Sequence, residues 1–267
     1  MIIKRLYKYV LKSSRGISHS EVNVDLSGFR HDRCVCIVDE SGKVITGREL
    51  PELVKLKSGV VRDRLAIETK MGETIDFGLP KNNNFVDYKL FKNQVSGCCF
   101  DDAANHWLSE LLHGNYRFVY LNGKFNSVSK KRGGREGDIK AFADSAPIHL
   151  INLKTLNYLN SKLTSNVSAR NFRPNIIVDG HEPFEEDKWE YLEIDGLKFR
   201  VQERTGRCVF TTIDPETAKK DRTMQPLATL AKVRLSMGQR PTMGVGLVPL
   251  ESGEIAVGNS VVITSNA

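Results

Sequence analysis

The sequence predicts a mainly β protein of the α+β class, with two β-rich parts and a few helices. Apolar and polar residues alternate over short runs such as 22–26, which is the pattern of a half-buried strand. Turn-forming residues separate these runs at short intervals. Helical spacing of apolar residues occurs in only a few stretches. The 267 residues, 40% of them hydrophobic, suffice for one large or two modest domains.

The N-terminal part is predicted to consist of short strands. The continuous apolar run Cys34–Val38 predicts a strand buried on both faces, and the turn after it predicts a hairpin. The expected strands, in chain order, cover residues 2–10, 22–26, 34–38, 44–46, 65–67 and 74–77.

The middle of the chain contains the clearest helix, at 101–113. Asp101 can cap it, the apolar residues 104, 107, 108, 111 and 112 share one face, and Gly114 can end it. A strand is expected at 116–121. The basic, glycine-containing stretch 130–135 is either a solvated loop or a lid that faces an anion. The boundary between the two β-rich parts is expected near residues 90–120.

The C-terminal part is predicted to be β-barrel-like, with a few helices. The helix at 226–235 carries proline in its first turn, where a missing N–H costs nothing. The tail 253–264 is expected to form a hairpin-like strand pair. The other expected elements are strands at 148–151, 176–178 and 197–201 and a helix at 155–163.

The charge balance and the absence of several sequence patterns narrow the set of possible partners and functions. With 39 basic and 32 acidic residues, the net charge of +7 favours anionic partners. No apolar run approaches the roughly 20 residues of a membrane-spanning helix, and the N-terminus lacks a signal-peptide core. We therefore expect a cytoplasmic protein that does not bind membranes. No nucleic-acid-binding pattern appears either, so a basic nucleic-acid binder is disfavoured.

The five cysteines do not form a recognisable disulfide, zinc or iron–sulfur pattern. Their odd number argues against a disulfide framework, and the zinc spacing C-x2-C and the spacing C-x4-C-x2-C of plant-type ferredoxins are absent. The sequence also lacks the phosphate-binding glycine motifs and the nucleophile-elbow motif. A zinc site built from Cys34-x-Cys36 and the pair Cys98-Cys99 is therefore the disfavoured alternative, and we expect any metal–cysteine chemistry from a single thiol.

Cys208 is the strongest candidate for that thiol. Arg207 precedes it, and a neighbouring cation favours the thiolate form that ligates metals. The residues 209–213 are β-branched or aromatic and predict a strand that holds the sulfur rigidly. A buried structural cysteine is the alternative, because free cysteines are among the most buried residues.

Charged and small polar residues recur at the edges of the predicted strands. Such turns offer arginine forks and backbone amides, which suit a phosphate-bearing cofactor. Taken singly, each is also compatible with a surface ion pair. The stretches are 12–13, 31–33, 144–145, 173–175 and 206–208.

Nine motifs in a fixed order resemble the MOSC proteins, in particular the branch that holds the amidoxime-reducing component and its bacterial relatives. The motifs are Lys12-Ser-x-Arg-Gly16, Gly28-x-x-x-Asp-Arg33, Thr46-Gly-Arg48-x-x-Pro51, Ala143-Asp-x-x-Pro147, Asn171-Phe-Arg-Pro-Asn175, Glu186-Asp-x-Trp189, Arg207-Cys-x-x-Thr-Thr-x-Asp-Pro215, Pro226-Leu-x-Thr-Leu230 and Gly253-x-Ile-x-Val-Gly258. The resemblance covers nearly the whole chain. It implies an N-terminal β-barrel domain at 1–95, a connecting helix at 101–113 and a MOSC domain at 115–267.

The resemblance also implies a molybdenum cofactor, in which a pterin dithiolene and one cysteine thiolate ligate the metal. Cys208 takes the position of that ligand, and Asp144 that of a proton source or of a residue that orients the site. The remaining implied cofactor contacts are Lys12, Ser13, Arg33, Ser145, Ala146, Arg173, Asn175, Gly206 and Arg207.

The implied activity is reduction of N-hydroxylated compounds such as hydroxylamines, amidoximes and hydroxylaminopurines. Electrons would come from a separate flavoprotein or iron–sulfur protein, because the chain carries no iron–sulfur motif of its own. A non-catalytic carrier or transfer module for the cofactor or its sulfur is the alternative. The sequence departs from the family at Thr205-Gly206, where Cys-Ser is usual, and at Ser145-Ala146, where Thr-Ser is usual. Both changes affect the substrate pocket more than the cofactor.

Overall fold

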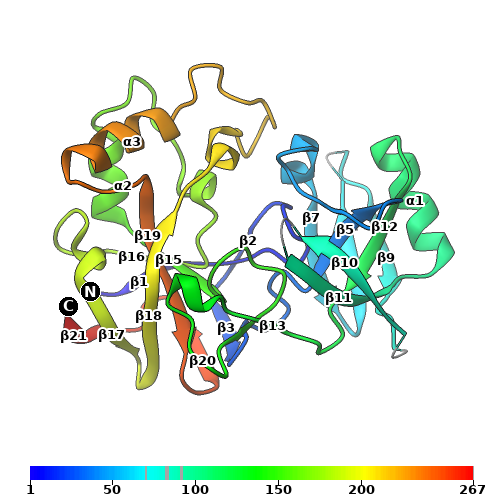
Figure 1. Cartoon of the computed structure of the whole chain (residues 1–267), viewed down its shortest axis with the longest axis horizontal. Helices are drawn as coiled ribbons and strands as arrows, with labels where there is room; N and C mark the ends of the chain where they lie inside the picture. The colour runs from blue at the N-terminus through cyan, green and yellow to red at the C-terminus, as the bar shows by residue number, and fades with distance from the viewer. Residues whose placement is uncertain (70, 82–83, 91–92, 267) are drawn as a thin grey trace.

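Short strands dominate the computed structural model, which describes residues 1–69, 71–81, 84–90 and 93–266. The predicted α+β class is confirmed, with the strands gathered in two lobes (Figure 1). In these residues no helix is long and apolar enough to cross a membrane.

An eight-stranded sheet forms the lobe that contains both chain ends. Ile3, Leu6, Leu150, Phe199 and Leu247 belong to the core cluster packed on this sheet. All neighbouring strands are antiparallel except the parallel pair β15 and β16. Their order is β2 (Ile17–His19), β1 (Ile3–Lys8), β16 (Ile176–Val178), β15 (Ile148–Asn152), β19 (Thr242–Pro249), β18 (Leu197–Gly206), β17 (Trp189–Ile194) and β21 (Val261–Asn266).

The C-terminal tail is not the strand pair that the sequence predicts. β20 (Gly253–Ala256) pairs with β3 (Glu21–Asp25), which also pairs with β4 (Gly28–Phe29), whereas β21 pairs with β17. The expected hairpin is therefore wrong. The connecting residues bond to β1 instead of closing a tight turn: Gly258 N donates to Ile3 O, and Ile3 N donates to Asn259 O.

The second lobe holds a five-stranded and a three-stranded sheet. Their strands are β10 (Phe85–Leu90), β11 (Asn93–Cys99), β12 (Tyr116–Tyr120), β5 (Val35–Asp39) and β6 (Val44–Ile45), followed by β7 (Lys57–Val61), β8 (Arg64–Glu68) and β9 (Thr74–Gly78). Helix α1 (Asp102–Leu112) packs Ala104 and Leu108 into this core. Asp101 caps the helix as predicted, but His113, with φ 54°, takes the left-handed position expected near Gly114.

The two further helices lie together on the first lobe. Helix α2 (Leu153–Asn160) begins earlier than expected, because Asn152 caps it by accepting from Lys154 N at 2.9 Å. Helix α3 (Leu227–Ser236) begins just after Pro226. The remaining elements are β13 (Asn126–Ser127), β14 (Ile139–Lys140) and five short 3-10 turns, η1 (Pro51–Lys55), η2 (Lys130–Arg132), η3 (Ala169–Phe172), η4 (Glu185–Lys188) and η5 (Val209–Thr212).

The chain passes between the two cores four times. Residues 3–6 and 22–29 belong to the core of the eight-stranded sheet, whereas residues 10–11 and 34–142 contribute to the other core. β1 accordingly starts in the left lobe and the chain then runs toward the right one (Figure 1). The lobes therefore do not coincide with the segments 1–95 and 115–267, since strands from the first 30 residues join the C-terminal sheets.

Candidate functional site

Three of the four crossings between the cores bring the predicted site residues together. Lys12 and Ser13 lie on the second crossing, Arg33 ends the third, and Asp144 lies on the fourth. A backbone that leaves one core for another cannot continue a sheet, so its polar groups are available at the boundary. Candidate residues far apart in sequence meet there for this topological reason.

Cys208 follows the end of β18 and precedes the 3-10 turn η5. The prediction that residues 209–213 form a strand is therefore wrong. Thr211 Oγ1 donates to Cys208 O at 2.9 Å, and Thr212 Oγ1 donates to Val209 O at 2.8 Å. Such local bonds from threonine hydroxyls compete with sheet pairing. They hold the half-buried thiol at the start of a turn instead.

Arg48 is the cation that contacts this thiol. Its Nη2 lies 3.1 Å from Cys208 Sγ and 3.1 Å from Asp144 Oδ2. The other carboxylate oxygen, Oδ1, pairs with Lys12 Nζ, which also donates to Phe142 O at 2.8 Å. Lys12, Asp144, Arg48 and Cys208 thus form a continuous series of polar contacts.

The two cations keep Asp144 ionised. Burial among protein atoms would raise the pKa of its carboxyl, but the charges and hydrogen bonds of Lys12 and Arg48 outweigh burial and hold this pKa well below its usual value. The Asp144 side chain remains 43% exposed, so water screens part of the attraction. A carboxylate of this kind orients cations, and it carries no proton to donate near neutral pH.

The turn that carries Arg48 is built by its own sequence. Thr46 Oγ1 donates to Glu49 Oε2 at 2.7 Å, and Leu50 N donates to Thr46 O at 2.9 Å. A side chain on Gly47 would meet the ring of Phe210, because an added Cβ would lie 2.5 Å from it. Glycine therefore lets the turn approach η5 and puts the next residue beside the thiol.

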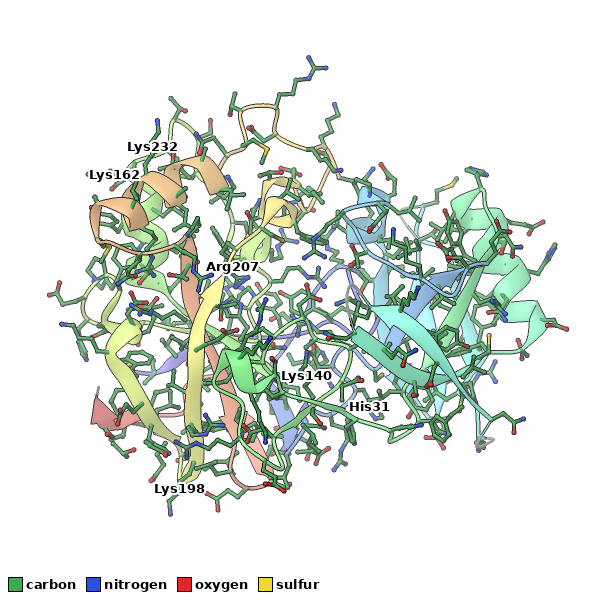
Figure 2. All side chains as sticks on the ribbon, in the orientation of Figure 1. His31, Lys140, Lys162, Lys198, Arg207 and Lys232 are labelled. Atoms are coloured by element: carbon green, nitrogen blue, oxygen red, sulfur yellow. The ribbon has the colours of Figure 1, made fainter. Side chains whose placement is uncertain are left out.

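Arg207, although adjacent in sequence to the thiol, directs its guanidinium into the first lobe (Figure 2). It donates to Phe172 O at 3.1 Å and to Met243 O at 3.2 Å, and its Nη2 lies 3.0 Å from His149 Nδ1. Burial lowers the pKa of Arg207 to about 10 and that of His149 well below its usual value. A neutral imidazole can accept from the guanidinium through one nitrogen and donate to Met243 O through the other.

Arg33 and Arg173 flank the ring of Tyr9. Their guanidinium carbons lie 4.6 Å and 4.2 Å from its centroid, a distance at which cation–π attraction operates. Burial raises the pKa of Tyr9 to about 12 and lowers that of Arg173 to about 10. Arg173 Nη1 donates to Ser14 O at 2.6 Å, whereas its Nη2 is buried with no hydrogen-bond partner among the described residues.

The Asn175 side chain links Arg33 to two backbone segments next to Tyr9 and Arg173. Its Oδ1 accepts from Arg33 Nη1 at 3.0 Å and from His149 N at 3.1 Å, and its Nδ2 donates to Tyr7 O at 3.1 Å. Because both ends of the amide are engaged inside the protein, Asn175 positions Arg33 for the site.

The other predicted residues surround the same boundary. Ser13 is buried and takes a left-handed φ of 73°. Ser145 Oγ bonds to Glu203, and the side chain of Ala146 lies close to Gly246, where an added Cβ would come within 2.5 Å. Gly206 has open space around the position of a side chain.

The basic stretch 130–135 packs against β18 beside these residues. Arg200 donates to Gly133 O at 3.1 Å, and an added Cβ on Gly133 would lie 2.3 Å from Gln202 O. Lys140, between the lobes in Figure 2, donates to Ala143 O at 2.5 Å and so supports the backbone before Asp144.

Sequence reasoning missed Arg48 and His149 as parts of the site. The motif Thr46-Gly-Arg48 was a usable signal, because a glycine and an arginine beside a turn indicate a close approach to another element. His149 had no such signal, since it lies inside the predicted strand 148–151.

Comparisons with known proteins agree over most of the chain. The model described as MOSC domain matches residues 138–262, and the model described as MOSC N-terminal beta barrel domain matches residues 1–115. "Mitochondrial amidoxime reducing component 2" of Rattus norvegicus is 35% identical over 245 residues, which are 87% of this chain and 72% of that protein. "Mitochondrial amidoxime-reducing component 1" of Xenopus laevis is 30% identical over 88% of this chain and 72% of its own length. The protein of that name from Mus musculus is 29% identical over 97% and 81%.

Proposed function

Because this chain belongs to the MOSC-domain family, we propose that it is a molybdenum-cofactor-dependent oxidoreductase that reduces N-hydroxylated compounds. The contact between Cys208, Arg48 and Asp144 is the observation that carries the proposal. In this contact the half-buried Cys208 thiol lies beside the Arg48 guanidinium at the boundary between the lobes, which supports the proposal.

The residues at this boundary fit an anionic, metal-bearing cofactor. Lys12, Arg33, Arg48, Arg173 and Arg207 outnumber the carboxylates of Asp32 and Asp144 that pair with them. The buried, unpartnered Nη2 of Arg173 is a donor that a phosphate or pterin oxygen would satisfy. We assign Cys208 as the metal ligand and the arginines and Lys12 as the groups that hold the anionic part.

Reduction of an N–OH group to an amine consumes two electrons and two protons and releases water. When bound, a molybdenum–pterin group supplies the two-electron chemistry of this reaction. Arg48 and Lys12 fix the Asp144 carboxylate, and we assign Asp144 to orienting Arg48 against the thiol. The electrons come from a separate flavoprotein or iron–sulfur protein, since the sequence carries neither iron–sulfur spacing nor a dinucleotide-binding motif.

Molybdenum analysis tests the ligand assignment. We expect molybdenum in the purified wild-type protein and at least tenfold less in Cys208→Ser, because an alcohol is a much poorer ligand than a thiolate for a soft metal site. Cys99→Ser is the matched control, since Cys99 is a second partly exposed cysteine and lies on β11 in the other lobe. Full molybdenum content in Cys208→Ser would reject Cys208 as the ligand.

A second measurement separates catalysis from cofactor transfer. The molybdenum-loaded protein, reduced chemically, is expected to convert benzamidoxime to benzamidine and hydroxylamine to ammonia, with release of water, over many turnovers. A protein that holds molybdenum and accepts electrons, yet converts neither compound, would instead be a carrier or transfer module. The relatives are named mitochondrial, and a cytoplasmic location remains our prediction for this chain, to be checked by cell fractionation.

A further inference from the structure

A cavity of about 510 Å³ lies beside the candidate site and has no role in the proposed reaction. Its lining includes Arg5 and Tyr7 from β1, Ser18 from β2 and Ile177 from β16, and the turn η3 adds Ala169 and Arg170. Its volume falls within the range of roughly 300–1,000 Å³ that is typical of small-molecule sites. We call it the basic cavity.

Four cationic residues line the basic cavity, namely Lys4, Arg5, Arg15 and Arg170, and among the described residues no aspartate or glutamate lines it. Glu216, outside the lining, pairs with both Arg15 and Arg170. Lys4 and Arg5 have no ion pair in the described part of the chain and are exposed. The cavity therefore keeps an excess of positive charge.

An irregularity in β1 puts Lys4 and Arg5 on this cavity together. Consecutive strand residues ordinarily point to opposite faces. The pairing of β1 with β16 shifts between Ile3 and Arg5, and the buried residues Ile3 and Leu6 are three positions apart. Such a bulge re-aims side chains and is typical of functional edges. Here it turns two adjacent cations toward the same depression.

The remaining lining suits the organic part of a ligand. Tyr7 and the apolar Leu153, Ala169 and Ile177 offer a surface on which a flat ring can pack. We propose that the basic cavity binds the phosphate groups and base of a nucleotide. A ligand with two or more negative charges, such as a diphosphate, can pair with several of the four cations, and the aromatic and apolar part of the lining accommodates the base.

The position of the cavity leaves two sources for this nucleotide. Arg15, Gly16 and Arg170 also line a smaller cavity that reaches Tyr9, Arg173 and Phe210 of the candidate site. The nucleotide is therefore either a free molecule or the nucleotide portion of a dinucleotide form of the cofactor. The second source rests on the proposed function, whereas the first does not.

Calorimetric titration tests the binding. We expect ADP and inorganic pyrophosphate to bind the purified protein, adenosine not to bind, and added salt to weaken binding because the attraction is electrostatic. The double variant Lys4→Gln/Arg5→Gln is expected to bind ADP at least about tenfold more weakly, since it removes two of the four cations that line the cavity. Lys198→Gln/Lys232→Gln removes the same charge from exposed positions away from the cavity (Figure 2) and should bind within twofold of wild type.

The titration is repeated on cofactor-free Cys208→Ser and on molybdenum-loaded protein. ADP binding by both forms indicates a free nucleotide, and it persists even where the molybdenum assignment fails. ADP binding by the cofactor-free form alone, with release of one nucleotide per molybdenum on acid treatment of the loaded form, indicates the dinucleotide cofactor. The proposal is overturned where neither form binds ADP or pyrophosphate and no nucleotide is released. Equal weakening by the two double variants also overturns it.

Discussion

Arg48 Nη2 and Cys208 Sγ lie 3.1 Å apart although 160 positions separate the two residues in sequence. Arg48 belongs to a turn of the second lobe, and Cys208 follows the last residue of β18 in the first. The same nitrogen also contacts Asp144, on the fourth crossing between the cores. The position of the Arg48 guanidinium beside the thiol therefore depends on how the two lobes pack against each other.

Arg48→Lys is expected to lower the rate of N-hydroxylated compound reduction per molybdenum about 10- to 100-fold. A lysine keeps the charge but lacks the planar fork that reaches both partners, and a lost charged hydrogen bond is worth about 1.5–3 kcal/mol. Steady-state kinetics normalised to molybdenum content measures this effect. Arg64→Lys, at an exposed ion pair with Asp76 in the same lobe, is the matched control. An unchanged rate in Arg48→Lys would show that the bridge does not serve catalysis.

Asp144→Asn is expected to reduce the free energy of unfolding by about 1 kcal/mol, a small effect because the side chain is partly solvated. The folded-state pKa of Asp144 is depressed, so its contribution is present above the unfolded-state value near 3.8 and is lost as pH falls below it. The difference from wild type should therefore stay constant between about pH 5 and 8 and shrink below about pH 4. Urea titrations across this range measure it, and a difference that grows toward low pH would contradict the ion-pair assignment.

Tyr9 can be tested with two substitutions that separate its hydroxyl from its ring. Tyr9→Phe loses the hydrogen bond to Pro174 O at 3.1 Å and should cost about 1 kcal/mol while retaining molybdenum. Tyr9→Leu also removes the ring between Arg33 and Arg173 and should cost about 3 kcal/mol and lower the molybdenum content. Equal behaviour of the two variants in urea unfolding and metal analysis would exclude a role for the ring.

Glu186 predicts a pH dependence of stability away from the site. It is fully buried, its Oε2 accepts from Thr155 Oγ1 at 2.8 Å, and burial raises its pKa from 4.5 to about 7. The folded state therefore retains a proton that the unfolded state releases, so the free energy of unfolding should fall by about 3 kcal/mol as pH rises from 4.5 to 7.

Glu186→Gln should remove this slope, because the amide does not titrate. Glu190→Gln, at an exposed position on the next strand, should retain the slope. Urea unfolding at several pH values between 4 and 8 distinguishes the two. A wild-type stability that rises over this interval would contradict the raised pKa.

Much of the fold follows from local patterns that the structure reproduces. Val22 and Val24 lie in β3 and residues 35–38 of the continuous run 34–38 lie in β5, all with the expected burial, and Asp101 caps the expected helix. These features depend on neighbouring residues, whose periodicity and capping chemistry are visible in the sequence. The prediction of a strand pair at 253–264 is wrong because the partners of these strands, β17 and β3, lie far away in sequence and leave no local signal.

The candidate thiol, the excess of cations and the order of the motifs are visible in the amino-acid sequence. Which cation contacts Cys208 depends instead on how the chain folds: the adjacent Arg207 bonds to His149 and backbone carbonyls, while Arg48, distant in sequence, contacts the sulfur. Residues 209–213 were expected to form a strand, but most of them form the 3-10 turn η5, in which Thr211 and Thr212 donate to nearby backbone carbonyls. The contact between Arg48 and Cys208 cannot be read from local patterns, because the crossings of the chain between two cores set the distance between residues far apart in sequence.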